Sequence, residues 1–360
     1  MKCKLGEIVD VIMGQSPKSE FYNTDGKGYP FLQGNRTFGL KYPTFDIYTT
    51  VLTKLAEAGD VIMSVRAPVG ELNITPVDMC LGRGVCSLRM KNGNQSYLFY
   101  MMKYYIPYLL QKESGTVFGS VSKRDITELD VDIIEDVEKQ KKIARYLEMI
   151  DDKIELNNAI NNNLVHQAEA IYQAWFEKFS LSNGSCPPTW KRGILADIAN
   201  ITSGKRPQKK STKKLNGLEI PLVGATSIVG FTNEANYTNK ILVIGRVGTH
   251  GIVQRINSPC WASDNTLVIT SELYEYTFQI LQKINYHAMN RGSTQPLITQ
   301  ADMNRVVILI PDNQILTEFE STVGQLMQKY EANLMENTKL AELRDYLLPR
   351  LISGELDINI

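Results

Sequence analysis

The chain has 360 residues, 43% hydrophobic and 22% charged, which indicates a folded protein too long for a single hydrophobic core. Lys and Arg number 39, as do Asp and Glu, so the overall charge points to neither nucleic acid nor a membrane. Five cysteines without CxxC spacing predict reduced thiols rather than a disulfide framework or a zinc site. The N-terminus lacks a signal-peptide core, and no apolar run approaches the ~18 residues of a spanning helix, so we expect a cytoplasmic protein with no membrane partner.

Short apolar runs separated by Gly, Pro and Asn dominate the first third of the chain and predict strands. These runs lie within 7–12, 29–34, 60–65 and 128–134, and a longer apolar segment at 96–112 predicts a helix. The second half repeats this order. Its strand-like runs are 220–224, 241–245, 266–269 and 306–310, and its predicted helix is 272–285.

The two halves also resemble each other in their residues. Segment 5–17 (LGEIVDVIMGQSP) resembles 195–207 (LADIANITSGKRP), and three later segments match in the same order. Those pairs are 30–39 with 221–230, 60–70 with 240–251, and 126–134 with 303–311. This alignment places Arg66 on Arg246 and Cys80 on Cys260. The repeated arginines are compatible with a structural ion pair or with a base contact. The pattern predicts two α+β domains in tandem.

Each half ends in a long amphipathic segment whose apolar residues follow 4-3 spacing, which is typical of a coiled coil. The two stripes have the same phase, and both carry Asn at the same two core positions: Asn157 and Asn161, then Asn333 and Asn337. If the helices pair antiparallel, Asn157 faces Asn337 and Asn161 faces Asn333. Paired Asn would fix register, because a slip would leave each amide against Leu or Ile. Packing of each stripe against its own domain, with solvent-facing Asn, is the alternative.

The charge is unevenly distributed. Residues 191–311 hold 14 basic and 7 acidic side chains, residues 1–135 hold 15 of each, and 312–360 hold 4 and 9. Residues 205–214 (KRPQKKSTKK) contain six Lys or Arg. A basic loop next to a rigid sheet suits contact with phosphates, although a solvated surface loop explains it equally well.

Motifs for catalysis are missing. The sequence has no GxxxxGK[ST], GxSxG or HExxH, and its three histidines do not cluster. A methyltransferase or nuclease acting alone is therefore disfavoured.

The order of these segments resembles that of specificity (S) subunits of type I restriction–modification enzymes. Segment 5–17 resembles the start of their target recognition domains, 138–158 (EKQKKIARYLEMIDDKIELNN) their central helix, and 343–356 (LRDYLLPRLISGEL) their C-terminal ending. The resemblance implies an α+β fold in which two target recognition domains are each followed by a helix, the helices pairing as an antiparallel coiled coil with pseudo-two-fold symmetry. The expected divisions are domain 1 at 1–135, the central helix at 136–180, a linker at 181–190, domain 2 at 191–311 and the C-terminal helix at 312–360.

The resemblance also implies a non-catalytic subunit that reads a bipartite sequence in double-stranded DNA. A helix of ~34 residues, roughly 50 Å long, would hold the domains about one DNA turn apart. The expected partners are two methylation (M) subunits and, through them, restriction (R) subunits. No cofactor is expected in this chain; S-adenosylmethionine, ATP and Mg would belong to those partners. A coiled-coil scaffold that never touches DNA is the competing hypothesis.

Polarity and position in loops, rather than the resemblance, suggest which residues contact DNA. In the first domain they are Gln15, Lys18, Asn35, Arg36, Lys123 and Arg124. In the second they are Lys205, Arg206, Lys209, Lys210, Thr226, Arg291, Ser293 and Gln295.

Overall fold

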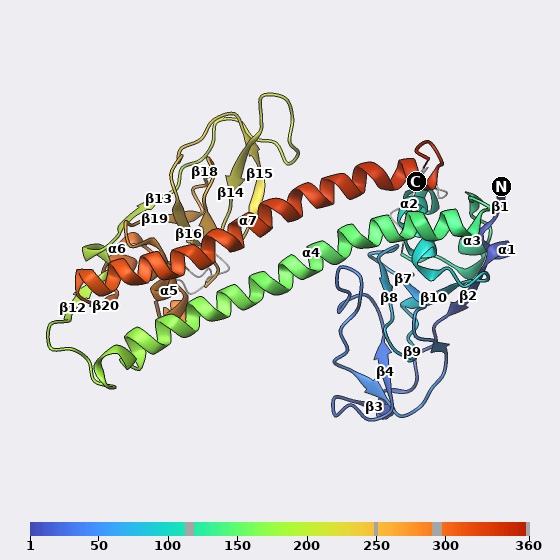
Figure 1. The fold of residues 1–360 in the computed structure, drawn as a ribbon, viewed down its shortest axis with the longest axis horizontal. Helices are drawn as coiled ribbons and strands as arrows, with labels where there is room; N and C mark the ends of the chain where they lie inside the picture. Colours follow the sequence, from blue (N-terminus) through green and yellow to red (C-terminus); the bar gives the residue numbers. More distant parts are fainter. Residues whose placement is uncertain (112–118, 248–250, 290–296, 358–360) are drawn as a thin grey trace. The chain divides into compact units, whose positions relative to one another are not determined.

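A computed structural model describes residues 1–111, 119–247, 251–289 and 297–357 (Figure 1). The chain forms two compact units: the first comprises Met1–Ala159 with Asn333–Ile360, and the second comprises Ile160–Ala332. The unit boundaries fall inside two long helices, α4 (Val137–Tyr172) and α7 (Asn313–Ile352). Each unit therefore contains one globular domain and a segment of both helices. Among the helices of the described residues, none combines the length and apolar character needed to cross a membrane.

The first unit is built on two sheets. An antiparallel sheet has the order β2-β10-β7-β8, and a mixed sheet has the order β3-β5-β4-β9-β6, in which β4 and β9 run parallel. A separate pair, β1-β11, joins the ends of the domain. The strands are β1 (Lys2–Lys4), β2 (Val9–Met13), β3 (Tyr22–Asn23), β4 (Tyr29–Leu32), β5 (Tyr48–Thr49), β6 (Leu55–Ala56), β7 (Val61–Ser64), β8 (Leu72–Ile74), β9 (Met79–Leu81), β10 (Val85–Met90) and β11 (Asp130–Asp132). The helices are α1 (Leu5–Ile8), α2 (Gln95–Gln111) and α3 (Lys123–Thr127), with a 3₁₀ turn at Ser19–Phe21.

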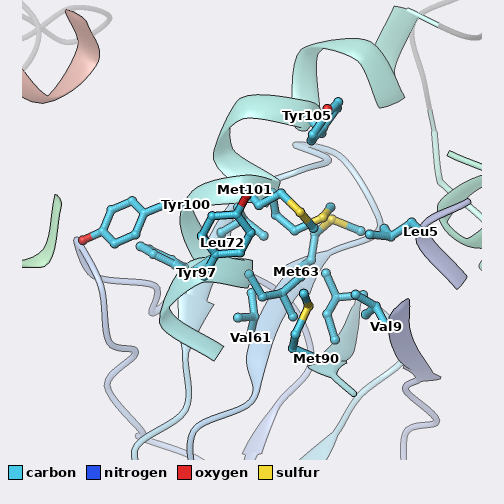
Figure 2. Packing of buried hydrophobic residues seen from close by; sticks show 14 of the residues in the cluster. Leu5, Val9, Val61, Met63, Leu72, Met90, Tyr97, Tyr100, Met101 and Tyr105 are labelled. Carbon is cyan, nitrogen blue, oxygen red and sulfur yellow. The ribbon is translucent and has the colours of Figure 1, made fainter. Parts of the chain in front are cut away.

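Helix α2 forms the centre of the first core, as its apolar sequence predicts. Figure 2 shows Tyr97 and Met101 from α2 close to Val61 and Met63 from β7, all within one buried cluster. The same cluster takes in residues from both long helices, namely Ile143, Ala144 and Leu147 of α4 and Leu351 and Ile352 of α7. The first core is thus closed by the last turns of α7.

The second unit repeats this plan. Its antiparallel sheet has the order β13-β19-β16-β17, a three-stranded sheet has the order β15-β14-β18 with β14 and β18 parallel, and β12 pairs with β20. The strands are β12 (Lys191–Ile194), β13 (Asn200–Ser203), β14 (Ile220–Val223), β15 (Ile228–Thr232), β16 (Ile241–Gly245), β17 (Val253–Ile256), β18 (Trp261–Ala262), β19 (Thr266–Thr270) and β20 (Val307–Ile310). The helices are α5 (Tyr274–Lys283) and α6 (Gln300–Asn304), with 3₁₀ turns at Ser180–Ser182, Leu195–Asp197 and Tyr286–Met289.

Aromatic side chains dominate the second core. Phe176 lies in a π-helical turn, Gln173–Glu177, that ends α4. Its ring packs 4.8 Å from that of Tyr276 in α5 and 5.0 Å from that of Phe319 in α7. Tyr172 and Trp190 complete the cluster. The end of α4 therefore closes the second core, just as the end of α7 closes the first.

Buried polar contacts fix each domain on the long helices. In the first unit Asp151 of α4, 1% exposed, accepts from Tyr100 Oη at 2.9 Å and from Arg344 Nη1 at 2.9 Å. Burial, followed by the Asp151 carboxylate, raises the pKa of Tyr100. In the second unit the Glu320 carboxylate of α7 accepts from the backbone N–H groups of Glu275 and Tyr276 at the start of α5. Burial raises the pKa of Glu320, although these two donors act in the opposite direction.

The strand pairings confirm the repeat but correct its alignment in one region. Phe31 pairs with Cys80 and Leu222 pairs with Trp261, so Cys80 corresponds to Trp261 rather than to Cys260. Likewise the bridge Arg66–Ser120 corresponds to Val247–Leu297, so Arg66 does not correspond to Arg246. A one-residue slip in a strand reverses which face each side chain occupies. The identical residues at these positions therefore do not occupy equivalent places in the two domains.

The helix stripes are buried or half-buried at every 4-3 position within the two units. In the first unit the segments of α4 and α7 run antiparallel, and Asn157 Nδ2 donates to Asn337 Oδ1 at 2.9 Å. This is the pair that the spacing predicts. Asn157 Nδ2 also donates to Glu336 Oε2 at 2.8 Å. In the second unit Asn161 Nδ2 donates to Tyr330 O at 3.3 Å.

The Asn157–Asn337 contact can be tested with a double-mutant cycle. Asn157→Leu alone leaves the Asn337 amide against an apolar side chain, and we expect a loss of about 1–3 kcal/mol in the free energy of unfolding. The double variant with Asn337→Leu should lose less than the two single losses combined. Denaturant unfolding measures all four corners, and exposed Asn162→Leu serves as the control. Additive losses would contradict a direct contact.

Closure of the first core by α7 gives a second prediction. Leu351→Ala removes a side chain that is 2% exposed, so we expect the free energy of unfolding to fall by about 2–5 kcal/mol. Hydrogen exchange should locate the new exposure in β7, β10 and α2. Tyr346→Ala, at a position 56% exposed on the same helix, should have little effect on either measurement. Faster exchange confined to α7 would show that the first core does not need it.

Candidate nucleic-acid interface

One edge of each domain gathers the loops that follow four strands. In the first domain these loops follow β2, β4, β7 and β9, and they comprise residues 14–18, 33–36, 65–66 and 82–84. Residues 119–124, which lead into α3, lie with them. In the second domain the corresponding residues are 204–210, 224–227, 246–247, 263–265 and 297–301. We call each set the loop edge of its domain.

Backbone hydrogen bonds join the loops of each edge into one frame, and six of them recur at corresponding positions, all 2.8–3.1 Å long. In the first domain they run from N to O in the pairs Gly14–Val85, Gln15–Leu81, Gly82–Leu32, Val85–Gly82, Val65–Gly84 and Val121–Val65. In the second domain they are Gly204–Thr266, Lys205–Ala262, Ser263–Val223, Thr266–Ser263, Arg246–Asn265 and Ile298–Arg246. Because backbone groups make these bonds, side chains at the edge can change without disturbing them.

The repeated Gly of the Gly-x-x-Pro turn has a packing reason. A Cβ on Gly14 would lie 2.0 Å from Gly82 O, and one on Gly204 would lie 2.0 Å from Ser263 O. Any side chain at either position would therefore push the first loop away from the strand connection beside it. The sequence motif reports this close approach of two backbones.

The family model for the type I restriction modification DNA specificity domain matches residues 1–166 and again residues 187–344. The chain belongs to this family. Membership of the specificity family assigns it to DNA sequence recognition in a type I restriction–modification system.

Individual relatives agree with the family match. The chain is 24% identical to the type I restriction enzyme MjaIX specificity subunit of Methanocaldococcus jannaschii, over 99% of this chain and 93% of that one. It is 39% identical over 148 residues to the putative MjaX specificity subunit of the same organism, a match that spans 41% of this chain and 35% of the relative. The crystal structure of the type I S subunit from M. genitalium has the same fold, with a TM-score of 0.65, 18% identity and coverage of 100% and 96%.

The predicted first-domain residues all lie on the loop edge of this specificity-family fold, but their side chains differ in availability. Gln15, Lys123 and Arg124 are exposed. Arg36 is engaged, because its Nη2 donates to both carboxylate oxygens of Asp46, at 2.6 and 2.8 Å. Asn35 Nδ2 donates to Glu71 Oε2 at 2.7 Å. Lys18 Nζ lies 3.7 Å from Glu20 Oε1 on the surface.

The basic segment of the second domain is held at its backbone and exposed at its side chains. Trp261 Nε1 donates to Lys205 O at 2.6 Å, and Thr232 Oγ1 donates to Lys209 O at 2.6 Å. Within the part of the chain that the structure describes, Lys205, Arg206, Lys209 and Lys210 make no ion pair, and Thr226 is also exposed. Arg291, Ser293 and Gln295, also predicted to contact DNA, lie outside the described residues.

Two exposed charged residues of the loop edge were not predicted from sequence. Arg83 stands between Gly82 and Gly84, and its backbone N–H donates to Ser16 Oγ at 3.1 Å. Asp264 holds the corresponding place in the second domain, between Ser263 and Asn265. The Gly-Arg-Gly triplet, a charged residue flanked by two small ones after a buried strand, was the available signal. The described residues hold no cluster of three or more His, Cys, Asp or Glu that could bind a metal ion.

The close backbone approach at the repeated turn predicts matched effects of Gly14→Ala and Gly204→Ala. Because the new Cβ would displace a neighbouring carbonyl, each variant should lose about 1–3 kcal/mol of unfolding free energy. Hydrogen exchange should show the loosening in the loop edge of the mutated domain alone. Gly34→Ala is the control, since a Cβ there meets no atom within 4 Å. Equal losses for all three variants would show that the close backbone approach is not their cause.

Proposed function

We propose that each loop edge contacts one half of a bipartite DNA target and that this chain supplies the sequence specificity of a type I restriction–modification complex. The observation that carries the proposal is the recurrence of one backbone frame with different side chains. Gln15 corresponds to Lys205, and Arg83 corresponds to Asp264. A fixed frame with variable polar groups suits the reading of two different base sequences.

The second domain supplies the stronger electrostatic contact in this proposal. Its residues 191–311 carry 14 basic and 7 acidic side chains. The exposed cations of 205–210 sit on an anchored backbone, so phosphate contact would release counterions without first breaking an ion pair. The first domain has 15 basic and 15 acidic residues in 1–135, and Arg36 is neutralised by Asp46. Its affinity would depend more on neighbouring subunits.

Those neighbouring subunits would dock on the helices. In the first unit α4 and α7 carry large apolar side chains at exposed positions, where an isolated helix pair would normally carry polar residues. They are Tyr146, Met149, Leu156, Met335, Leu343 and Tyr346, which are 40–63% exposed. We propose two methylation subunits as the partners, with restriction subunits binding through them. S-adenosylmethionine, ATP and Mg would then act on those partners, while this chain remains non-catalytic.

The direct test is selection from a randomised duplex pool by this chain co-purified with its methylation subunit. Two short half-sites at a fixed spacing of about one turn should be recovered. A pool that stays random would instead favour a coiled-coil scaffold that does not touch DNA.

Salt dependence tests the basic segment. We expect the combined replacement of Lys205, Arg206, Lys209 and Lys210 by Gln to reduce the slope of log K against log salt by roughly 3–4 units, since each lost phosphate contact contributes about 0.9. Fluorescence anisotropy between 50 and 300 mM salt measures the slope. Arg36→Gln should leave it nearly unchanged, because Asp46 already pairs with that guanidinium. An unchanged slope in the quadruple variant would remove this segment from the interface.

Domain exchange tests the modular reading. Replacing residues 191–311 by the same region of a relative should change one half-site and leave the other intact. Sequencing of selected duplexes provides the readout, and a change in both halves would contradict independent domains.

A further inference from the structure

We propose that Arg83 and Asp264 are the specificity-determining residues at one position in each half-site. Arg83 would donate to the acceptors of a guanine, and Asp264 would accept from the amino group of a cytosine. This inference rests on the proposed DNA contact of the loop edges, and it adds which residues discriminate and for which bases.

Arg83 occupies the middle of the first loop edge. The loop around it is bonded to three neighbours: Gly82 N donates to Leu32 O, Gly84 N to Gln33 O, and Arg83 N to Ser16 Oγ, at 2.8, 3.0 and 3.1 Å. A Cβ on Gly82 would lie 2.6 Å from Gln33 Cα, and one on Gly84 would lie 2.2 Å from Gln33 O. The two glycines therefore let the loop pack tightly against residue 33, and this holds the Arg83 backbone in place.

The Arg83 side chain is left available. It is exposed, and in the described parts of the chain it makes no ion pair or hydrogen bond, in contrast to Arg36 with its Asp46 partner. Guanidinium groups present two parallel donors that match guanine O6 and N7. The paired donors of Arg83, held on the loop 82–84, suit contact with a base edge. The lysines of 205–214, as flexible single charges, suit phosphates.

Asp264 occupies the same place in the second frame. Ser263 N donates to Val223 O, as Gly82 N does to Leu32 O in the first domain. Arg246 N donates to Asn265 O, as Val65 N does to Gly84 O. The carboxylate is exposed and makes no ion pair with any described residue, although the domain is strongly basic. Phosphates repel a carboxylate, so its favourable contact on DNA is a base amino group, and cytosine N4 is the usual one. The two domains thus place opposite charges at one position of the frame.

The experiment uses the complex with the methylation subunit and selection from a randomised duplex pool. Arg83→Ala should lose the preference at one base pair of one half-site, by about 5- to 150-fold, with the other half-site unchanged. Arg83→Lys should keep overall affinity closer to wild type while losing part of that preference, because it retains the charge but not the fork. Asp264→Asn and Asp264→Ala should relax one base pair in the opposite half-site.

The alternatives give distinct results. If Arg83→Ala weakens binding uniformly for all sequences, Arg83 contacts phosphate and the inference is wrong. If Arg36→Ala, the matched control on the same edge, relaxes a base pair while Arg83→Ala does not, the assignment belongs to the neighbouring loop. Thermal unfolding checks each variant, and Arg83→Lys decides the question if the alanine variant fails to fold. If the unmodified complex selects no half-sites, the proposed DNA contact itself fails.

Discussion

Closure of each globular core by the ends of both long helices is the constraint on which the structure depends. Neither sheet system is sealed by its own sequence neighbours. The first core includes Leu351 and Ile352, and the second includes Tyr172 and Phe176. Each core therefore takes side chains from both helices, and within the first unit the Asn157–Asn337 hydrogen bond joins the two antiparallel helix segments. We therefore expect helix pairing and domain folding to be coupled in each unit.

In each loop edge, main-chain hydrogen bonds hold the loops together and leave several side chains exposed. Six hydrogen bonds per domain, all between main-chain atoms, set the shape of the edge. Gly14 and Gly204 are fixed by contact between backbones, whereas Gln15, Arg83 and their counterparts project from a frame that does not use their side chains. Exchange of these exposed side chains should therefore cost little stability, because they are not part of the core, and under the proposed DNA contact it would change the sequence that is read.

Much of this arrangement could be predicted from the sequence, and the exceptions share a cause. Periodicity located the two long helices, and the Asn spacing predicted the partner of Asn157. The order of repeated segments predicted two like domains. The alignment of the two halves was wrong by one residue for Arg66 and Arg246, because residue identity alone does not show which face of a strand a side chain occupies. Arg36 was predicted to contact DNA, yet its guanidinium pairs with Asp46, which the connection between β4 and β5 brings beside it. Conversely Lys41, an ordinary loop lysine by sequence, is 3% exposed and contacts Glu148 and Asp152 of α4. Such contacts depend on tertiary packing between distant segments.

The position of Leu351 and Ile352 has a consequence for synthesis on the ribosome. A nascent chain normally completes its N-terminal domain first. Here Leu351 and Ile352, which pack in the first core, are translated after every residue of the second core, which extends no further than Tyr330. The domain that emerges first is thus completed after the second, and until Leu351 and Ile352 are made its core around α2 lacks their cover.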